Sequence, residues 1–287
     1  MVTAILTPTL LAQPARLSAR VVARAYLQRV LEVAPRVEID LGEAPSDSEA
    51  VHDLRVALRR LRNWLRLWRP FLRDTLTKRS ERRLRRISSL AGEARDLEVA
   101  HAWLASPATR RFLRVRTAAD WFDRRMAVEY RQARRRLSDI LLRELSRTAA
   151  GLDAELRRYR VEVDLDAPGS DPAMATAVAE LLGRMAARLP RALASVRRAG
   201  QVDEAHRARI AVKRLRYLLD TFDRSSRFAA TAAGPLASFQ HLLGNLHDAQ
   251  LLASRLSTDR AAKTAARRPL RAAVQAALRR RIAALFR

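Results

Sequence analysis

The feature that most constrains the fold is the stretch at residues 51–68, VHDLRVALRRLRNWLRLW, in which two side-chain stripes share one helix. Its apolar residues recur every three or four positions, as expected for one face of an α-helix; they are Val51, Leu54, Leu58, Leu61, Leu65 and Trp68. A second stripe with the same spacing holds His52, Arg55, Arg59, Arg62 and Arg66. The stretch therefore predicts a helix that buries one face and holds cations at the edge of the core.

The rest of the chain is also predicted to be helical, because Ala, Leu and Arg dominate it and only 8 of its 287 residues are glycine. Helical periodicity predicts helices over residues 14–37, 51–70, 76–104, 174–199, 205–223, 238–256 and 269–286. Residues 109–159 are predicted to form one very long helix or two abutting helices. Strand-like alternation is confined to residues 161–165. The sequence thus predicts an all-α fold.

A domain boundary is predicted at residues 164–172, DLDAPGSDP, where two prolines and a glycine lie among acidic residues. We therefore expect an N-terminal helical half over residues 14–163 and a C-terminal half over residues 172–287. Each half has about four predicted helices, so the expected architecture is two four-helix bundles.

The basic helix occurs twice in the chain. Residues 205–219, AHRARIAVKRLRYLL, match residues 51–65 at an offset of 154 residues. The second stripe is His206, Arg209, Lys213 and Arg216, and Arg214 stands opposite Arg60. Residues three and four apart on a helix have Cβ atoms about 5–6 Å apart, so each stripe offers successive oxyanions a ladder of donors. A merely solvated face needs no matching positions, and the repetition therefore favours anion binding.

A second matching pair follows each basic helix. Residues 90–100, LAGEARDLEVA, match residues 242–252, LLGNLHDAQLL, so that Asp96 corresponds to Asp248 and Arg95 to His247. We expect the two aspartates to orient an arginine or histidine on a facing helix. Gly92 and Gly244 are expected to allow close helix approach. The repeated helix order predicts a pseudo-two-fold that places the basic helices on either side of a shared groove.

The charge of the chain limits its partners. Its formal net charge of +26, from 56 basic residues, repels itself unless a polyanion neutralises it. Nucleic acid, an anionic membrane surface and a chain of phosphates all satisfy this requirement. The absence of cysteine excludes disulfides, thiolate zinc sites and cysteine nucleophiles. No stretch approaches the roughly 18 uncharged apolar residues of a membrane span, so we expect a soluble cytoplasmic protein.

The two repeated segments together resemble a known family. The pattern H-x-x-R-[VI]-x-x-[RK]-[RK]-L-R occurs twice, each time followed by L-x-G-x-x-[RH]-D, and it is similar to the conserved histidine α-helical domain, abbreviated CHAD. The resemblance extends from about residue 14 to the C-terminus. It implies two pseudo-symmetric four-helix bundles that flank a basic cavity, binding of inorganic polyphosphate and no catalytic activity. It also implies association with polyphosphate granules, as in several members.

Carried onto this chain, the resemblance assigns the family histidine to His52 and His206, its basic positions to Arg55, Arg59, Arg62, Arg209, Lys213 and Arg216, and its later aspartates to Asp96 and Asp248. We add Arg66 to the predicted binding residues, and Arg60, Arg214, Arg95 and His247 to the supporting ones. The repeat does not extend to Asp53, whose counterpart is Arg207. No catalytic residue, cofactor or metal ligand is expected.

Two other functions remain open. The dipeptides His52-Asp53 and His247-Asp248 also occur in metal-dependent phosphohydrolases of the HD type, although a lone dipeptide specifies little. Non-specific nucleic-acid binding suits the charge, but the aromatic residues make up only 5% of the chain and do not interleave with the basic stripes. We expect the aromatic residues at helical spacing to lie in the core; they are Trp64, Trp68, Trp121, Phe122, Phe222 and Phe239. The arginine runs at residues 79–86 and 131–137 are read as an outer charged face that could extend a polyanion track.

Overall fold

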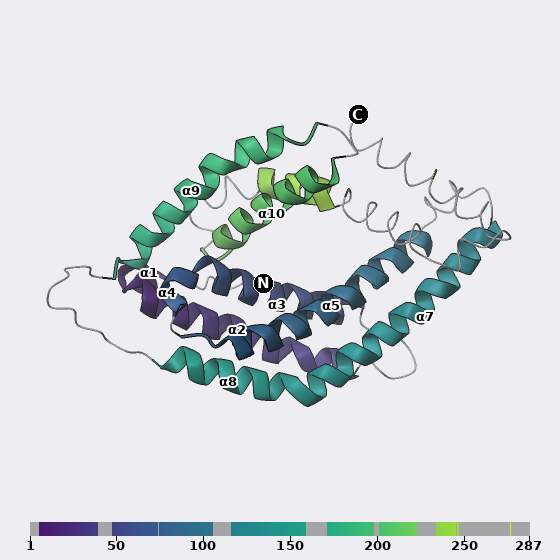
Figure 1. The fold of residues 1–287 in the computed structure, drawn as a ribbon, viewed down its shortest axis with the longest axis horizontal. Helices are drawn as coiled ribbons and strands as arrows, with labels where there is room; N and C mark the ends of the chain where they lie inside the picture. Colours follow the sequence, from purple (N-terminus) through teal and green to yellow (C-terminus); the bar gives the residue numbers. More distant parts are fainter. Residues whose placement is uncertain are drawn as a thin grey trace. The chain divides into compact units, whose positions relative to one another are not determined.

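A computed structural model describes residues 6–39, 48–73, 75–105, 116–158, 171–197, 201–222, 234–244, 246 and 276. Within these residues every regular element is a helix, which confirms the predicted all-α fold (Figure 1). An isolated antiparallel bridge joins Pro14 to Ala173.

The helices are α1 (Pro8–Ala12), α2 (Ala15–Ile39), α3 (Ser48–Leu67), α4 (Arg69–Leu72), α5 (Lys78–Ala105), α7 (Arg116–Ile140), η1 (Leu141–Leu145), α8 (Ser146–Arg157), α9 (Met174–Ala194) and α10 (Val202–Leu219). The segment predicted at residues 109–159 is described from residue 116 to 158 as α7 and α8, joined without a break by η1, a five-residue π-helix. The helix predicted over 238–256 is described at 234–244 and 246, and the one predicted over 269–286 lies outside the described residues except at 276.

The chain divides into two compact units, and each draws on both halves of the sequence. The first unit comprises residues 1–92, 135–187 and 214–233, and the second comprises residues 93–134, 188–213 and 234–287. Helices α5, α7, α9 and α10 therefore contribute residues to both units. The division into halves at 14–163 and 172–287 stays a prediction drawn from the repeat.

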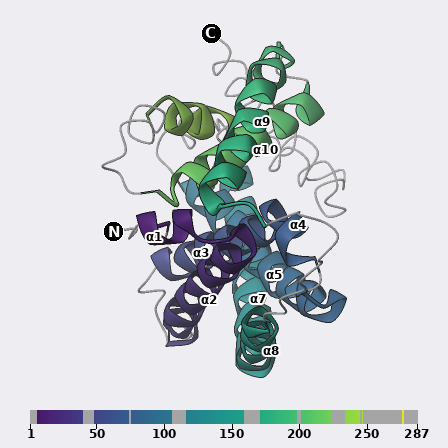
Figure 2. The same ribbon diagram turned by 90° about the vertical axis from the view of Figure 1, so that its left-hand side faces the viewer.

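The core of the first unit is built around α2, which packs against α3 and α8 (Figures 1 and 2). The predicted apolar stripe of α3 is buried along its whole length, with Leu54, Leu58 and Leu61 each 0% exposed. Trp64 lies between the rings of Tyr26 and Trp68, at centroid distances of 6.0 and 5.2 Å. Burial of each large apolar side chain contributes about 1.5–3 kcal/mol. The stripe therefore fixes how α3 is rotated about its axis.

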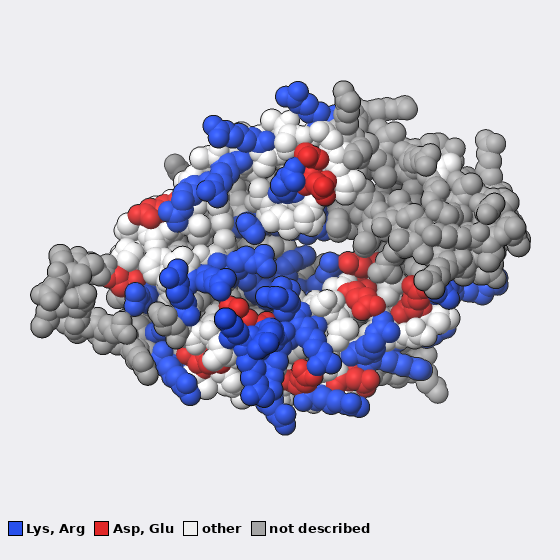
Figure 3. Space-filling model, viewed as in Figure 1, with Lys and Arg blue, Asp and Glu red and all other residues white. Residues whose placement is uncertain are grey.

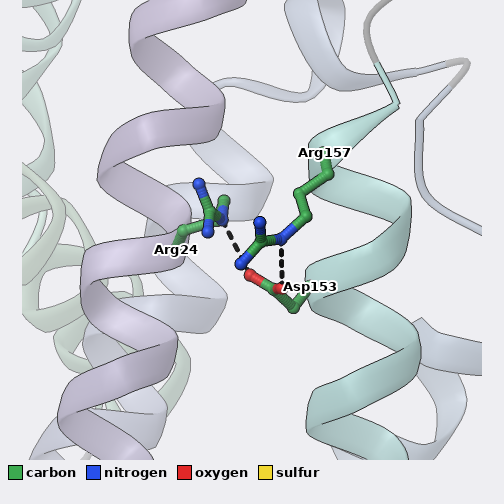
Figure 4. Close-up of polar contacts among 3 residues, drawn as sticks. All are labelled: Arg24, Asp153 and Arg157. Carbon is green, nitrogen blue, oxygen red and sulfur yellow. Dashed lines mark hydrogen bonds and ion pairs between the residues drawn. The ribbon is translucent and has the colours of Figure 1, made fainter.

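Polar contacts hold α8 against its neighbours at the edge of this core. The carboxylate of Asp153 accepts hydrogen bonds from Nε of Arg24 on α2, at 2.7 Å, and from Nε of Arg157, at 2.6 Å (Figure 4). These two hydrogen bonds lower the pKa of Asp153. Glu155 also accepts hydrogen bonds from the hydroxyls of Thr77, at 2.7 Å, and Ser80, at 2.8 Å, where α5 begins. Helix α8 is thus tied to both α2 and α5.

Three predictions about single residues are wrong. Gly92 and Gly244 do not mark close helix approaches, since a Cβ built on either meets no atom within 4 Å in the described part of the chain. Phe239 is not a core residue, because it is 44% exposed. Trp64 and Trp68 are buried as predicted, at 2% and 1% exposure. Phe222 is half-buried, and the side chains of Trp121 and Phe122 lie outside the described residues.

Candidate anion-binding site

The first predicted stripe lies on α3, beside the face that is buried in the core. His52, Arg55, Arg59 and Arg62 are half-buried, and Arg66 is exposed. This placement confirms that the stripe runs along the edge of the core. The hydrocarbon stems of the arginines can pack against apolar surface there while the guanidinium groups reach outward.

The last turns of α10 and the residue that follows them belong to the same unit and bring two side chains to α3, those of Tyr217 and Asp220. The guanidinium carbon of Arg59 lies 5.0 Å from the centroid of the Tyr217 ring, which is a cation–π geometry. Asp220 forms ion pairs with Arg60 of α3, at 3.8 Å, and with Arg216, at 3.5 Å. One carboxylate thus serves a cation from each copy of the repeat.

A second group of cations in this unit, which we call the four-arginine cluster, consists of Arg62 and Arg66 of α3, Arg85 of α5 and Arg214 of α10. Burial and the positive charges of Arg66 and Arg85 lower the pKa of Arg62. Burial and the charge of Arg66 likewise lower the pKa of Arg214. The charge of Arg66 therefore acts both on Arg62 of its own helix and on Arg214 of α10.

The immediate partner of Arg62 is neutral. Its Nη1 donates a hydrogen bond of 2.9 Å to the hydroxyl of Ser88 on α5. Within the described residues Arg62 forms no ion pair, so its charge is not balanced by a carboxylate there. An oxyanion in this position would offset the mutual repulsion of the cluster and accept hydrogen bonds from more than one guanidinium group.

The first turns of α10 carry the other half of the second stripe, and they belong to the second unit. His206 is exposed, and Arg209 and Lys213 are half-buried. The buried face beside them consists of small residues, with Ala205 at 4% exposure and Ala208 and Val212 at 0%. The second stripe therefore lies beside a buried face of its helix, as the first stripe does on α3.

The structure describes Arg95 and Asp96 of the predicted supporting residues on α5, but not their counterparts in the second copy. Arg95 forms an ion pair of 2.9 Å with Glu98 on its own helix, and Asp96 is half-buried. His247 and Asp248 lie outside the described residues, and the orienting role of the two aspartates stays a prediction. Asp53 forms an ion pair of 2.7 Å with Arg36 of α2. That contact links α2 to α3 and accounts for an acidic residue that the repeat does not share.

Sequence reasoning missed two residues of this site. Arg85 lies in a dense arginine run that reads as an outer charged face, and no sequence signal distinguishes it from its neighbours. Asp220 could have been found, because it follows Arg216 by four residues and such pairs lie on the same side of a helix.

Within the described ranges, no group of three or more His, Asp or Glu side chains is placed to hold a metal ion. Among the described helices, none has the length and apolar character that crossing a membrane requires.

Comparison with known proteins places the chain in a family. The model of the CHAD domain matches residues 21–257, which is most of the chain, and the protein therefore belongs to the CHAD domain family. A crystal structure of the CHAD domain from the plant Ricinus communis is 24% identical and has a TM-score of 0.73, with 99% of this chain and 91% of that chain covered. PptA from Streptomyces chartreusis is 17% identical, with a TM-score of 0.68 and 95% and 96% coverage. Both similarities concern the fold. A search of curated proteins finds no match.

Proposed function

We propose that this member of the CHAD domain family is a non-catalytic protein that binds inorganic polyphosphate through the basic stripes of α3 and α10. The observation that carries the proposal is the four-arginine cluster. It gathers cations from three helices: the charges of Arg66 and Arg85 act on Arg62, and the charge of Arg66 acts on Arg214. Within the described residues no carboxylate balances the charge of Arg62. The repulsion among these cations destabilises the folded protein, and a bound polyanion would offset that repulsion.

The extent of the stripe favours a long anion over a single phosphate. Residues 52 and 66 of α3 are 14 positions apart, which is about 21 Å along a helix axis. One phosphate would engage only one or two of the guanidinium groups along that length. A chain of linked phosphates presents oxyanions at every step, and arginine binds such oxygens with paired hydrogen bonds.

The aromatic residues near the stripe argue against single-stranded nucleic acid. Trp64 and Trp68 belong to the buried face of α3 and cannot stack on bases, while Tyr217 is 5% exposed and lies under Arg59. Binding to duplex DNA at low salt is nonetheless expected of a chain with net charge +26, because it requires only contacts with phosphates.

The test compares the wild-type protein with a variant in which Arg55, Arg59, Arg209 and Lys213 are changed to Ala. We expect the variant to lose binding to long-chain polyphosphate in isothermal titration while its circular dichroism stays helical. Its matched control changes four arginines of α2 and α9 that are exposed and lie outside the stripes: Arg29, Arg184, Arg188 and Arg191. Equal affinities of the two variants would contradict the assignment of the stripes.

A competition experiment separates polyphosphate from nucleic acid. We expect long-chain polyphosphate to stay bound when duplex DNA is added at equal phosphate concentration and physiological salt. Displacement by DNA would contradict the proposal and would favour a nucleic-acid-binding protein. Affinity for polyphosphate should fall steeply with salt, by analogy with the release of counterions from DNA.

We further propose a cytoplasmic location on polyphosphate granules. A fluorescent fusion of the full chain should gather on granules in cells that store polyphosphate. The four-residue stripe variant should spread through the cytoplasm, and retention of that variant on the granules would contradict binding through the stripes.

A further inference from the structure

An outer groove runs between α5 and the segment formed by the end of α7, η1 and the start of α8. It consists of two surface cavities of about 420 and 640 Å³, which share Arg82, Arg86 and Glu144 in their walls. Both cavities lie within the first unit. In Figure 3 basic side chains crowd over this part of α5 and α8, with few acidic side chains among them.

The smaller cavity is dominated by guanidinium groups. Arg79, Arg82, Arg83 and Arg86 of α5 and Arg147 of α8 surround a single carboxylate, that of Glu144. Glu144 forms an ion pair of 2.8 Å with Arg86, whose side chain is 67% exposed. The pair leaves most of the positive charge in this wall unbalanced by the lining carboxylate, at a place that solvent can reach.

The larger cavity continues the same chemistry. It adds Arg85 from α5 and Arg136 and Arg143 from the opposite wall, with Asp139 as the added carboxylate. None of the described residues that line the two cavities is aromatic, so these residues offer no platform for stacking bases. The groove is therefore suited to oxyanions without attached bases.

Local structure directs these cations into the groove. In η1 the side chains of Leu141 and Leu145 are buried, while Arg143 and Glu144 of the same segment line the cavities. A π-helical segment inside a helix is rare and frequently occurs at functional sites. The hydrogen bonds of Glu155 with Thr77 and Ser80 hold the start of α5 against α8, so the two walls are fixed to each other.

Arg85 connects the outer groove to the site proposed above. Arg85 lines the larger cavity together with Ser89. Arg62 donates its hydrogen bond of 2.9 Å to Ser88, which lies between these two residues in the sequence of α5. The four-arginine cluster and the larger cavity therefore meet at the same stretch of α5.

We propose that the outer groove is a second binding site for condensed phosphate, and that a long polyphosphate chain passes from the four-arginine cluster along Arg85 into it. This inference rests on the proposed function, because it takes polyphosphate as the ligand of the first site. The second site lies on a surface outside the repeated stripes. A protein with both sites should bind long chains more tightly than short ones.

The test uses an outer variant, R82Q/R86Q/R147Q, and a control variant with the same loss of charge, R29Q/R184Q/R188Q. Both are titrated with tripolyphosphate and with long-chain polyphosphate. We expect the outer variant to bind one tripolyphosphate in place of two, and to bind long chains at least about tenfold more weakly than the control. Its affinity should also depend less on salt, with a slope smaller by about 2, since each lost phosphate contact removes about 0.7 from the slope for a flexible single chain.

A second variant examines the connection. Arg85→Gln should weaken binding of long chains more than binding of tripolyphosphate, because each tripolyphosphate loses one of several cations whereas a continuous chain loses the cation that links the two sites. An unchanged affinity for long chains in R85Q would contradict the path between the sites.

The outcomes distinguish this inference from the proposed function. Outer and control variants with equal affinities would overturn the outer site and leave the stripes untouched. A wild-type protein that binds no polyphosphate would overturn the proposed function itself. An outer variant that loses affinity for duplex DNA but keeps its affinity for polyphosphate would show that the groove binds nucleic acid, which also overturns the inference.

Discussion

The two copies of the repeated helix place an identical arginine in different electrostatic surroundings. Arg62 on α3 and Arg216 on α10 occupy the same place in the motif, yet Arg62 has the charges of Arg66 and Arg85 near it, whereas Arg216 forms an ion pair of 3.5 Å with Asp220. Asp220 is itself the counterpart of Arg66, at the same offset of 154 residues. A repeated motif thus specifies residue types, while neighbouring helices determine whether each charge is balanced.

The buried faces of the two helices also differ, because their residues are not of the same size. Val51, Leu54 and Leu58 of α3 correspond to the smaller residues Ala205, Ala208 and Val212 of α10, and all six are buried. Over residues 51–59 the cations are therefore repeated more closely than the apolar residues beside them. A requirement for packing alone would preserve the buried side chains more closely than the cations beside them, which is the reverse of what is found. We infer that anion binding accounts for the repeated cations, with the α3 copy supplying more of the affinity.

The largest expected effect comes from exchanging the buried side chains of the two copies. Leu54→Ala should lower the free energy of unfolding by about 3 kcal/mol, because a cavity remains in a packed core. The reverse change, Ala208→Leu, should also destabilise the protein, by about 1–3 kcal/mol, since the methyl-sized site at 0% exposure must expand. Urea unfolding measures both changes. A neutral or stabilising Ala208→Leu would show that α10 lies over unfilled space and that the contrast between the cores is wrong.

The next effect comes from giving α3 the charge arrangement of α10. Arg66→Asp places a carboxylate four residues after Arg62, as Asp220 follows Arg216. We expect affinity for polyphosphate to fall roughly 30-fold, because one cation is lost and Arg62 acquires an internal partner. Isothermal titration at physiological salt measures the change. Arg66→Gln is the matched control and should lose less, and equal losses would contradict the internal partner.

Replacing each of the two equivalent arginines alone should separate the two copies. Arg62→Gln is expected to weaken polyphosphate binding about tenfold, since hydrogen bonds to charged groups contribute about 1.5–3 kcal/mol. Arg216→Gln should weaken it only about twofold, because Asp220 already holds that guanidinium group. The same titration measures both variants. Equal losses would mean that the ligand displaces Asp220 and that the two arginines are equivalent when bound.

Much of the fold could be predicted from the sequence, because it depends on local periodicity. The spacing of Leu54, Leu58 and Leu61 identified a buried face, and these residues are 0% exposed. Spacing along one helix also identified which cations share a face. Predictions that depend on a neighbouring helix were less successful. Gly92 was assigned to a close helix approach that the described residues do not show, and Phe239 to a core from which it is 44% exposed.

The environment of the site could not be predicted for the same reason. Arg85 comes from α5 and Tyr217 from α10, and their proximity to α3 depends on how three helices pack, which periodicity does not specify. The sequence repeat predicts two consecutive halves, and this division stays a prediction. The two compact units are a different division, because each draws on both halves of the chain.

A small gain in affinity is also expected, and it addresses the comparison most directly. Asp220→Asn removes the carboxylate that Arg60 and Arg216 share, so both cations become available to the ligand. We expect polyphosphate to bind two- to threefold more tightly in titration, because the ligand no longer competes with an internal anion for partly exposed groups. Asp53→Asn is the matched control, since it removes the same amount of charge but breaks an ion pair with Arg36, which lies outside the stripes. Equal gains in the two variants would attribute the effect to net charge and not to the release of the second stripe.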